Sequence, residues 1–210
     1  CEFSKRSAKF LGQTYACHAD YSDIREKIKK TSLKAALHSD AIGHHVEGRS
    51  NQDVQVLEVK NHFLRVEFSH DLHIMFPNLR SVKITHSDIQ RVIHHTFKHL
   101  PELISVDLSN NNIQELPTGI FSFNLNLIFV NFDENQLMRL PAGIFAKNLQ
   151  LDFISMDRNG CVNDEAVGNE EILNFVEKIR GKCAYENEPK EDPSMASKYM
   201  KIVTSHDGTF

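Results

Sequence analysis

The chain has 210 residues, of which 40% are hydrophobic, with a formal net charge of −4 at pH 7 and a pI of about 6.3. This length is sufficient to bury a sizeable core in one or two domains. The slightly acidic balance does not favour a nucleic-acid partner, and there is no run of about 18 apolar residues that would span a membrane. The chain begins at a cysteine, which leads us to expect a mature end left by removal of a signal peptide.

Residues 1–53 follow no repeat and are predicted to form an N-terminal cap. A small hairpin is suggested by residues that flank Gly12, namely Phe3, Phe10, Tyr15 and Cys17. Ser22 and Asp23 are suited to cap a short helix. Residues 33–37 suggest an irregular first strand, and residues 43–51 suggest a turn.

Residues 54–160 carry one pattern, leucine-x-x-leucine-x-leucine-x-x-asparagine-x-leucine, which returns at a fixed interval. Four copies start 24 residues apart, at Leu79, Leu103, Leu127 and Leu151. The same interval separates equivalent asparagines and phenylalanines, which are Asn111, Asn135 and Asn159, and Phe97, Phe121 and Phe145. A looser copy of 25 residues begins at Val54, and His62 and Ser87 replace the asparagine in the first two copies.

The start of each copy alternates apolar and polar residues, which predicts a short strand with one buried face. No single copy can bury its own apolar residues, so successive copies must stack. The phenylalanine is large enough to fill the space behind the strands. We therefore expect a parallel sheet on one side of the molecule, with loops or short helical turns on the other.

This pattern resembles the leucine-rich repeat, whose unit length spans the same interval. The resemblance implies an α/β fold, a right-handed solenoid or horseshoe of about five to six strands with a parallel sheet on its concave side and capped ends. It also implies that the asparagines turn inward and form a ladder of hydrogen bonds from copy to copy. Asn124 and Asn148 replace the apolar residue found at Leu100, and this F-x-x-N spacing resembles that of secreted arthropod members of the family.

Residues 161–183 are predicted to form a C-terminal cap. Asn169 and the two glutamates after it are typical of a helix start, and Gly181 is typical of a helix end. One face of this helix is apolar, with Ile172, Phe175, Val176 and Ile179. Residues 184–210 form a tail, polar at first, in which Met195 to Val203 suggest a short helix.

The four cysteines lie outside the regular copies, two before them and two after them, at Cys1, Cys17, Cys161 and Cys183. Pairing Cys1 with Cys17 and Cys161 with Cys183 joins close neighbours and gives each end its own disulfide. The alternatives are the two other pairings, four free thiols, or a lipid-modified Cys1. Disulfides are typical of secreted proteins, so we expect an extracellular location.

The candidate binding surface is the concave sheet, read from the outward positions of each strand. Three columns of side chains cross it: Val56, Ser81, Ser105, Phe129 and Phe153; Glu58, Lys83, Asp107, Asn131 and Ser155; and Lys60, Thr85, Ser109, Asp133 and Asp157. Parallel strands lie about 4.8 Å apart, so Phe129 and Phe153 should be neighbours, as should Asp133 and Asp157. An apolar anchor ringed by charge is typical of protein interfaces. The alternative is that the cap helix or the tail covers both phenylalanines.

Other chemistries find less support in the sequence. Histidines cluster at 44–45, 70–73 and 94–99, but no second ligand set accompanies them, which favours solvated histidines over a zinc site. Motifs of zinc proteases, serine hydrolases and phosphate-binding loops are missing. Adjacent aspartates on an open sheet lack a pocket that would tune their protonation. We expect no catalysis, no metal and no cofactor.

The resemblance implies a recognition scaffold for adhesion, signalling or innate immunity, without naming a ligand. Our leading hypothesis is that the protein binds another protein through the concave strands. The alternative is a structural subunit that self-associates as a homo-oligomer through its tail or a sheet edge. A binder gated by metal or pH through the histidine pairs is a third hypothesis.

Overall fold

The structure, a computed structural model, describes residues 2–8, 11–20, 45–61, 67–68 and 72–184. Several predictions lie outside these residues. They concern Cys1, the helix after Ser22, the strand at 33–37, the ladder position at His62 and the tail beyond residue 184.

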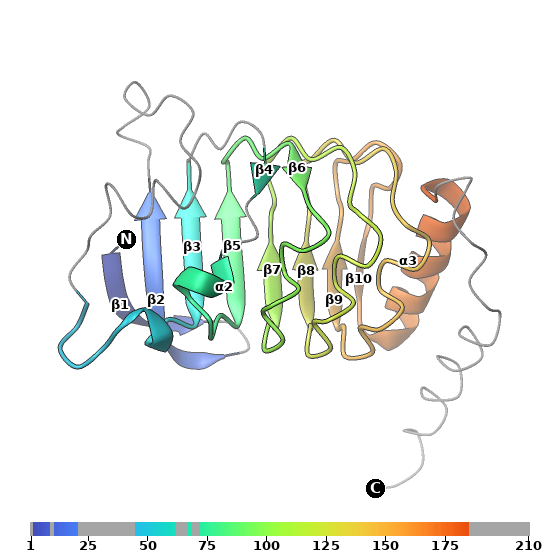
Figure 1. Cartoon of the computed structure of the whole chain (residues 1–210). Helices are drawn as coiled ribbons and strands as arrows, with labels where there is room; N and C mark the ends of the chain where they lie inside the picture. Colours follow the sequence, from blue (N-terminus) through green and yellow to red (C-terminus); the bar gives the residue numbers. More distant parts are fainter. Residues whose placement is uncertain (1, 9–10, 21–44, 62–66, 69–71, 185–210) are drawn as a thin grey trace, which may run out of the picture.

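The described residues build one sheet of eight strands, in which six parallel strands lie between two antiparallel ones (Figure 1). The parallel strands are β2 (Gly12–Asp20), β3 (Val56–Lys60), β5 (Ser81–Thr85), β7 (Ser105–Asp107), β8 (Phe129–Asn131) and β9 (Phe153–Ser155). Strand β1 (Glu2–Ala8) flanks β2, and β10 (Glu165–Val167) flanks β9. The predicted solenoid with a parallel sheet is confirmed.

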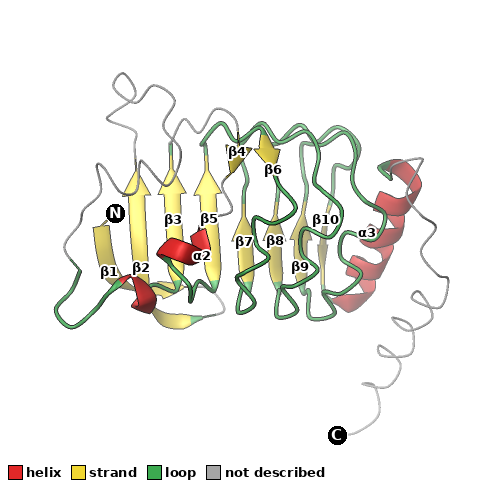
Figure 2. Cartoon of the chain, in the orientation of Figure 1, coloured by secondary structure: helices red, strands yellow, loops and turns green. Residues whose placement is uncertain are grey.

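Loops and turns cover the other side of the sheet (Figure 2). The regular elements there are the short helix α2 (Leu72–Met75) and a separate pair of strands, β4 (Glu67–Phe68) and β6 (Arg91–Val92). A 3-10 turn, η2 (Asn51–Asp53), precedes β3. Helix α3 (Asn169–Lys182) closes the C-terminal end of the stack.

The leucines that open the copies lie in one continuous core between the sheet and the loops. Leu79, Leu103, Leu127 and Leu151 are each at most 3% exposed and belong to one cluster. These copies and the looser copy before them add buried strand residues that lie in register, which are Leu57, Val82, Val106, Val130 and Ile154. Full burial of one such side chain contributes about 1.5–3 kcal/mol, so neighbouring copies stabilise one another.

The recurring phenylalanines form an aromatic line through this core. The rings of Phe97, Phe121 and Phe145 stack one on the next, with centroids 5.7 Å apart at both steps. All three side chains are at most 2% exposed. Aromatic pairs at such separations add about 0.5–1.5 kcal/mol beyond their buried area, so this line joins adjacent copies.

The predicted asparagine ladder is present. Asn135 donates from Nδ2 to the carbonyl oxygens of Leu108 and Phe132, at 2.9 and 3.0 Å, and its Oδ1 accepts from the backbone amide of Ile113 at 3.0 Å. Equivalent bonds occur one copy before and one copy after, at Asn111 and Asn159. Each amide therefore satisfies backbone groups of its own copy and of the preceding one.

Ser87 takes the asparagine position in the copy before this ladder. Its hydroxyl donates to the carbonyl oxygen of Thr85 in the same copy at 2.8 Å. Its backbone amide donates to Asn111 Oδ1 at 3.1 Å. Among the described residues, the run of amide side chains therefore starts at Asn111.

Asn124 and Asn148 form a second ladder on the loop side. Asn124 Nδ2 donates to the carbonyl oxygens of Phe97 and Leu100, at 3.0 and 2.7 Å. Asn148 repeats these bonds one copy later, with Phe121 and Asn124 as acceptors. The F-x-x-N spacing thus replaces the apolar packing seen at Leu100 with hydrogen bonds between neighbouring turns.

The N-terminal hairpin extends the sheet. Strands β1 and β2 pair antiparallel, and Gly12 at the turn has a φ of 68°, which residues with a side chain rarely adopt. Strand β2 then pairs in parallel with β3. The sequence indicated a hairpin but did not indicate that its second strand continues the parallel sheet.

One predicted disulfide lies at the C-terminal end. Cys161 and Cys183 are bonded, with Cα atoms 5.3 Å apart. Cys17 is also disulfide-bonded, and the partner predicted for it lies outside the described residues.

Helix α3 starts and packs as predicted but ends later than expected. Ile172, Phe175 and Ile179 are buried against the last repeat. The helix starts at Asn169, as expected, and its N-cap is Gly168, with a φ of 78° and no side-chain bond. Gly181 lies inside the helix, so the expectation that it ends the helix is wrong; the chain turns at Cys183, which the disulfide holds.

Candidate recognition surface

The side of the sheet that faces away from the core, called the open face below, carries the three predicted columns. Strand register aligns the first column, Val56, Ser81, Ser105, Phe129 and Phe153, and the second, Glu58, Lys83, Asp107, Asn131 and Ser155. In the third column Lys60 pairs with Thr85. Its remaining members, Ser109, Asp133 and Asp157, each follow two residues after a strand.

The columns differ in how much of each side chain is exposed. Thr85, Ser109 and Ser155 are 5%, 8% and 1% exposed, so they contribute little contact area. The other predicted site residues are partly or fully exposed: Glu58, Lys60, Lys83, Asp107, Phe129, Asn131, Asp133, Phe153 and Asp157.

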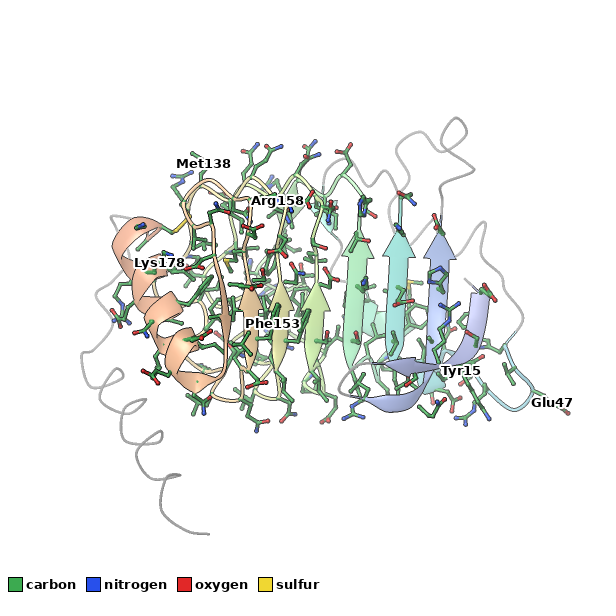
Figure 3. The ribbon with its side chains drawn as sticks, turned by 180° about the vertical axis from the view of Figure 1, so that it is seen from behind. Tyr15, Glu47, Met138, Phe153, Arg158 and Lys178 are labelled. Carbon is green, nitrogen blue, oxygen red and sulfur yellow. A yellow bond between two sulfur atoms is a disulfide. The ribbon has the colours of Figure 1, made fainter. Side chains whose placement is uncertain are left out.

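Two stacked aromatic rings lie on the open face. The ring centroids of Phe129 and Phe153 are 4.7 Å apart and their planes are within 5° of parallel. Both side chains are partly exposed. Figure 3 looks onto this face, with Phe153 labelled on the strands nearer to α3. Strand spacing alone produces this pair, because the two residues occupy the same position in successive copies.

Sequence reasoning missed a third member of this apolar surface. Val167 on β10 pairs in register with Phe153 and is 54% exposed. Because partners in register point to the same side of a sheet, Val167 extends the phenylalanine pair. We call Phe129, Phe153 and Val167 the apolar strip. Val167 follows the last copy, so no repeat position indicated it.

Ion pairs balance the charge on the N-terminal half of the open face. Glu58 Oε2 lies 3.0 Å from His18 Nδ1 and 3.6 Å from Arg6 Nη1. Lys83 Nζ lies 3.3 Å from Asp107 Oδ2. These pairs link β1 and β2 to β3, and β5 to β7. As partly exposed pairs, each stabilises the fold by at most about 1 kcal/mol.

Carboxylates dominate the C-terminal half of the same face. Asp133 Oδ1 accepts from the hydroxyl of Ser155 and, at 2.7 Å, from the backbone amide of Asp157. Asp157 Oδ2 lies 3.3 Å from Arg158 Nε, and Arg158 Nη1 also contacts Glu134 at 2.6 Å. Glu165 on β10 pairs in register with Ser155. Glu165 therefore lies in the column next to the apolar strip, and Asp133 and Asp157 lie one column further along the strands, beside Arg158.

A polar cavity of about 620 Å³ lies away from the apolar strip, where the N-terminal hairpin meets the starts of β3 and β5. Its lining includes Lys5, Tyr15, Arg49, Arg80 and Glu102. Positive and negative groups are mixed, so its charge does not select a class of ligand. The sequence did not indicate this cavity, because hairpin, turn and repeat residues line it together.

A capping box orders the turn beside this cavity. Asp53 accepts from the backbone amide of Ser50 at 2.8 Å and from Arg49 at 2.9 Å. These two donors hold the pKa of Asp53 below its ordinary value. The hydroxyl of Tyr15 accepts from the backbone amide of Val46 at 3.0 Å, which anchors the turn to β2.

Two histidine pairs are visible in the described part of the chain. The rings of His73 and His99 have centroids 4.6 Å apart, and those of His94 and His95 lie 3.8 Å apart. No group of three or more histidine, cysteine or acidic side chains in the described ranges is arranged to hold a metal ion. His44 and His70 lie outside those ranges.

Among the described residues, no helix has both the length and the apolar character that crossing a membrane requires.

Comparisons with known proteins agree with the architecture. The family model described as leucine rich repeat matches residues 77–122. A comparison with curated proteins finds no sequence match.

Solved structures with leucine-rich repeats share this fold. The leucine-rich repeat domain of APL1 has a TM-score of 0.51 at 16% identity, covering 76% of this chain and 36% of that chain. The LRIM1/APL1C complex gives the same score and identity, covering 76% of this chain and 27% of that chain. The Toll–Spatzle complex of Drosophila is more distant, with a TM-score of 0.45 at 18% identity over 51% of this chain and 17% of that chain.

This chain spans at most 36% of the length of the three solved chains named above. At these identities the likeness concerns the fold alone. The fold of this chain is a leucine-rich-repeat solenoid, as the repeat pattern, the shared core, the asparagine ladder and the matched structures all indicate.

Proposed function

We propose that this protein is a non-enzymatic recognition scaffold that binds another protein through the open face, with the apolar strip as the anchor. The observation that carries the proposal is the partly exposed, parallel stack of Phe129 and Phe153. Aromatic side chains at the centre of a contact, surrounded by polar groups, supply most of the binding energy in many protein interfaces.

The surroundings of the strip support this use. Its strands are short and tied into a continuous core, so the rings sit on a rigid support and lose little conformational freedom when they bind. The cavity at the other end of the molecule has a mixed charged lining, and Tyr15, the aromatic residue in that lining, is only 4% exposed.

The comparison structures support the class of function. LRIM1 and APL1C form a complex, and their structure shares the fold of this chain. We extend protein binding from those proteins to this one as part of the proposal. We also propose a secreted location, since Cys17, Cys161 and Cys183 are in disulfides, which persist in oxidising compartments.

The test replaces both rings at once, as Phe129→Ala with Phe153→Ala. This double variant, the control described below and the wild type are used to capture partners from extracellular fluid of the source, and each captured protein is then titrated in pure form. We expect the double variant to bind at least about 10-fold more weakly, the loss that follows when an anchor worth about 1.4 kcal/mol is removed.

Phe123→Ala is the matched control, because Phe123 is 53% exposed but lies on the loop side. It should leave the affinity unchanged. Thermal unfolding by circular dichroism shows whether the double variant is folded. Equal affinity of the folded double variant and the wild type would reject the proposal.

A further inference from the structure

We infer that the partner presents an apolar side chain flanked by arginine or lysine to the C-terminal half of the open face. The inference rests on the proposed function and adds the chemistry of the partner's binding segment. It follows from the position of the unbalanced charge relative to the apolar strip.

The acidic groups lie on strands that carry the strip or directly after them. Asp133 and Asp157 follow β8 and β9, four residues after Phe129 and Phe153, and Glu165 lies two residues before Val167. A ligand side chain seated on the strip therefore has carboxylates within the reach of the residues next to it.

These carboxylates are not balanced as their counterparts in the N-terminal half are. There, Glu58 faces Arg6 and His18, and Asp107 faces Lys83. Here, among the described residues, Arg158 is the cation paired with these acidic groups, and it lies between Glu134 and Asp157. The partners of Asp133 are a hydroxyl and a backbone amide, which leave its formal negative charge in place.

Charge complementarity thus selects between possible partner segments. A cationic segment gains attraction to Asp133, Asp157 and Glu165, whereas an acidic segment is repelled by all three. Arginine has a second favourable interaction, because its planar guanidinium stacks on aromatic rings and also pairs with carboxylates. The structure therefore favours a basic and apolar segment over an acidic one.

The experiment uses three blocked pentapeptides as probes. The first has a central tryptophan flanked by two arginines, the second has glutamates in place of the arginines, and the third has alanine in place of the tryptophan. The protein contains no tryptophan, so the fluorescence of the first two peptides reports binding without background. The third competes against the first.

We expect the arginine peptide to bind about 10-fold more tightly than the glutamate peptide at low salt. Added salt should reduce the difference, since surface charges are screened. The variant Asp133→Asn with Asp157→Asn should lose most of the preference for arginine. The asparagine at 133 keeps an oxygen that accepts the bonds from Ser155 and the backbone.

The matched control is Glu115→Gln with Glu177→Gln, which removes the same charge from exposed positions off the open face. It should keep the preference for arginine. Equal binding of both tryptophan peptides, an unchanged preference in the aspartate variant, or no binding of any peptide at about 1 mM would each overturn the inference.

The outcomes separate this inference from the proposed function. If both tryptophan peptides bind equally well, and this binding is lost when Phe129 and Phe153 are replaced by alanine, the strip remains the anchor of the proposed function. The inference of a basic partner segment is then rejected. If the arginine peptide binds more tightly than the glutamate peptide, and its affinity is unchanged when both phenylalanines are replaced, the result counts against the strip as the anchor.

Discussion

One backbone position in every copy adopts a left-handed conformation. Asn61, His86, Asn110, Glu134 and Arg158 follow one another at the repeat interval, with φ between 53° and 60°. A side chain other than glycine or asparagine costs about 1–2 kcal/mol in this region. The turn after each strand therefore requires this conformation whatever residue occupies the position. In three of the copies the residue is neither glycine nor asparagine: His86, Glu134 and Arg158.

This requirement predicts that Glu134→Asn stabilises the protein. Asparagine tolerates the left-handed region better than glutamate, and we expect a gain of about 0.5–1 kcal/mol in the free energy of unfolding, measured by urea titration. The ion pair lost with Arg158 is exposed and contributes little.

Glu115→Asn is the matched control for this change. Glu115 is also exposed and pairs with an arginine of the next copy, Arg139, but its φ is negative. It should be neutral or slightly destabilising. Equal effects of the two substitutions would show that backbone strain at Glu134 is not relieved.

At the scale of elements, the C-terminal cap combines three kinds of interaction. The disulfide joins the start of the cap to the end of α3, apolar residues of α3 cover the last repeat, and Lys178 on α3 donates to Asp164 before β10. Sequence reasoning found the disulfide and the apolar face. It did not find β10 or the Asp164 contact, since both join segments with no repeating pattern.

The Asp164 contact makes the stability of the cap depend on pH. Lys178, and then the backbone amide of Glu165, hold the pKa of Asp164 below its ordinary value of 3.8. The carboxylate is therefore favoured in the folded state, and its contribution is complete above pH 3.8 and is lost as the pH falls through the lower folded pKa.

Asp164→Asn should remove this dependence. We expect the variant to be less stable than the wild type at pH 7, with a difference that shrinks as the pH falls below about 4. Thermal unfolding across this range measures it. Asp152→Asn, an exposed aspartate before β9, is the control and should show a smaller difference. A difference between Asp164→Asn and wild type that stays constant down to pH 2 would contradict the assignment.

At the scale of the whole molecule, two interpretations of the interaction surface compete. The open face supplies the recognition surface proposed above, and self-association through the tail or a sheet edge is the competing interpretation. In the described sheet, β1 is the strand at the N-terminal edge and β10 is the strand at the other. Unpaired edges are common sites of association between chains.

Light scattering distinguishes the two interpretations. We expect the full chain to have the mass of one copy, 24.0 kDa, and a chain that ends at residue 184 to remain a monomer. This result follows if the open face, and not the tail, is the interface. A full-length dimer that dissociates when residues 185–210 are removed would favour the structural subunit.

The sequence by itself determined the parts of this protein that repeat. Each copy carries its own apolar positions and its phenylalanine, and stacking is the arrangement that buries them all, so the solenoid and the core followed from spacing. The asparagine ladder followed from the resemblance to the leucine-rich repeat. It also placed Phe129 beside Phe153, because the strand register copies the repeat interval.

Only the tertiary structure decided which outward residues are exposed, how their charges are balanced, and what lies next to the copies. Thr85 and Asp133 belong to the same column, yet Thr85 is buried and Asp133 is partly exposed. Val167 joins the strip, and Arg6 neutralises Glu58, only because non-repeating segments pack against the first and last copies. The physical reason is that burial of apolar residues is specified within each copy, whereas these contacts arise between segments distant in the chain.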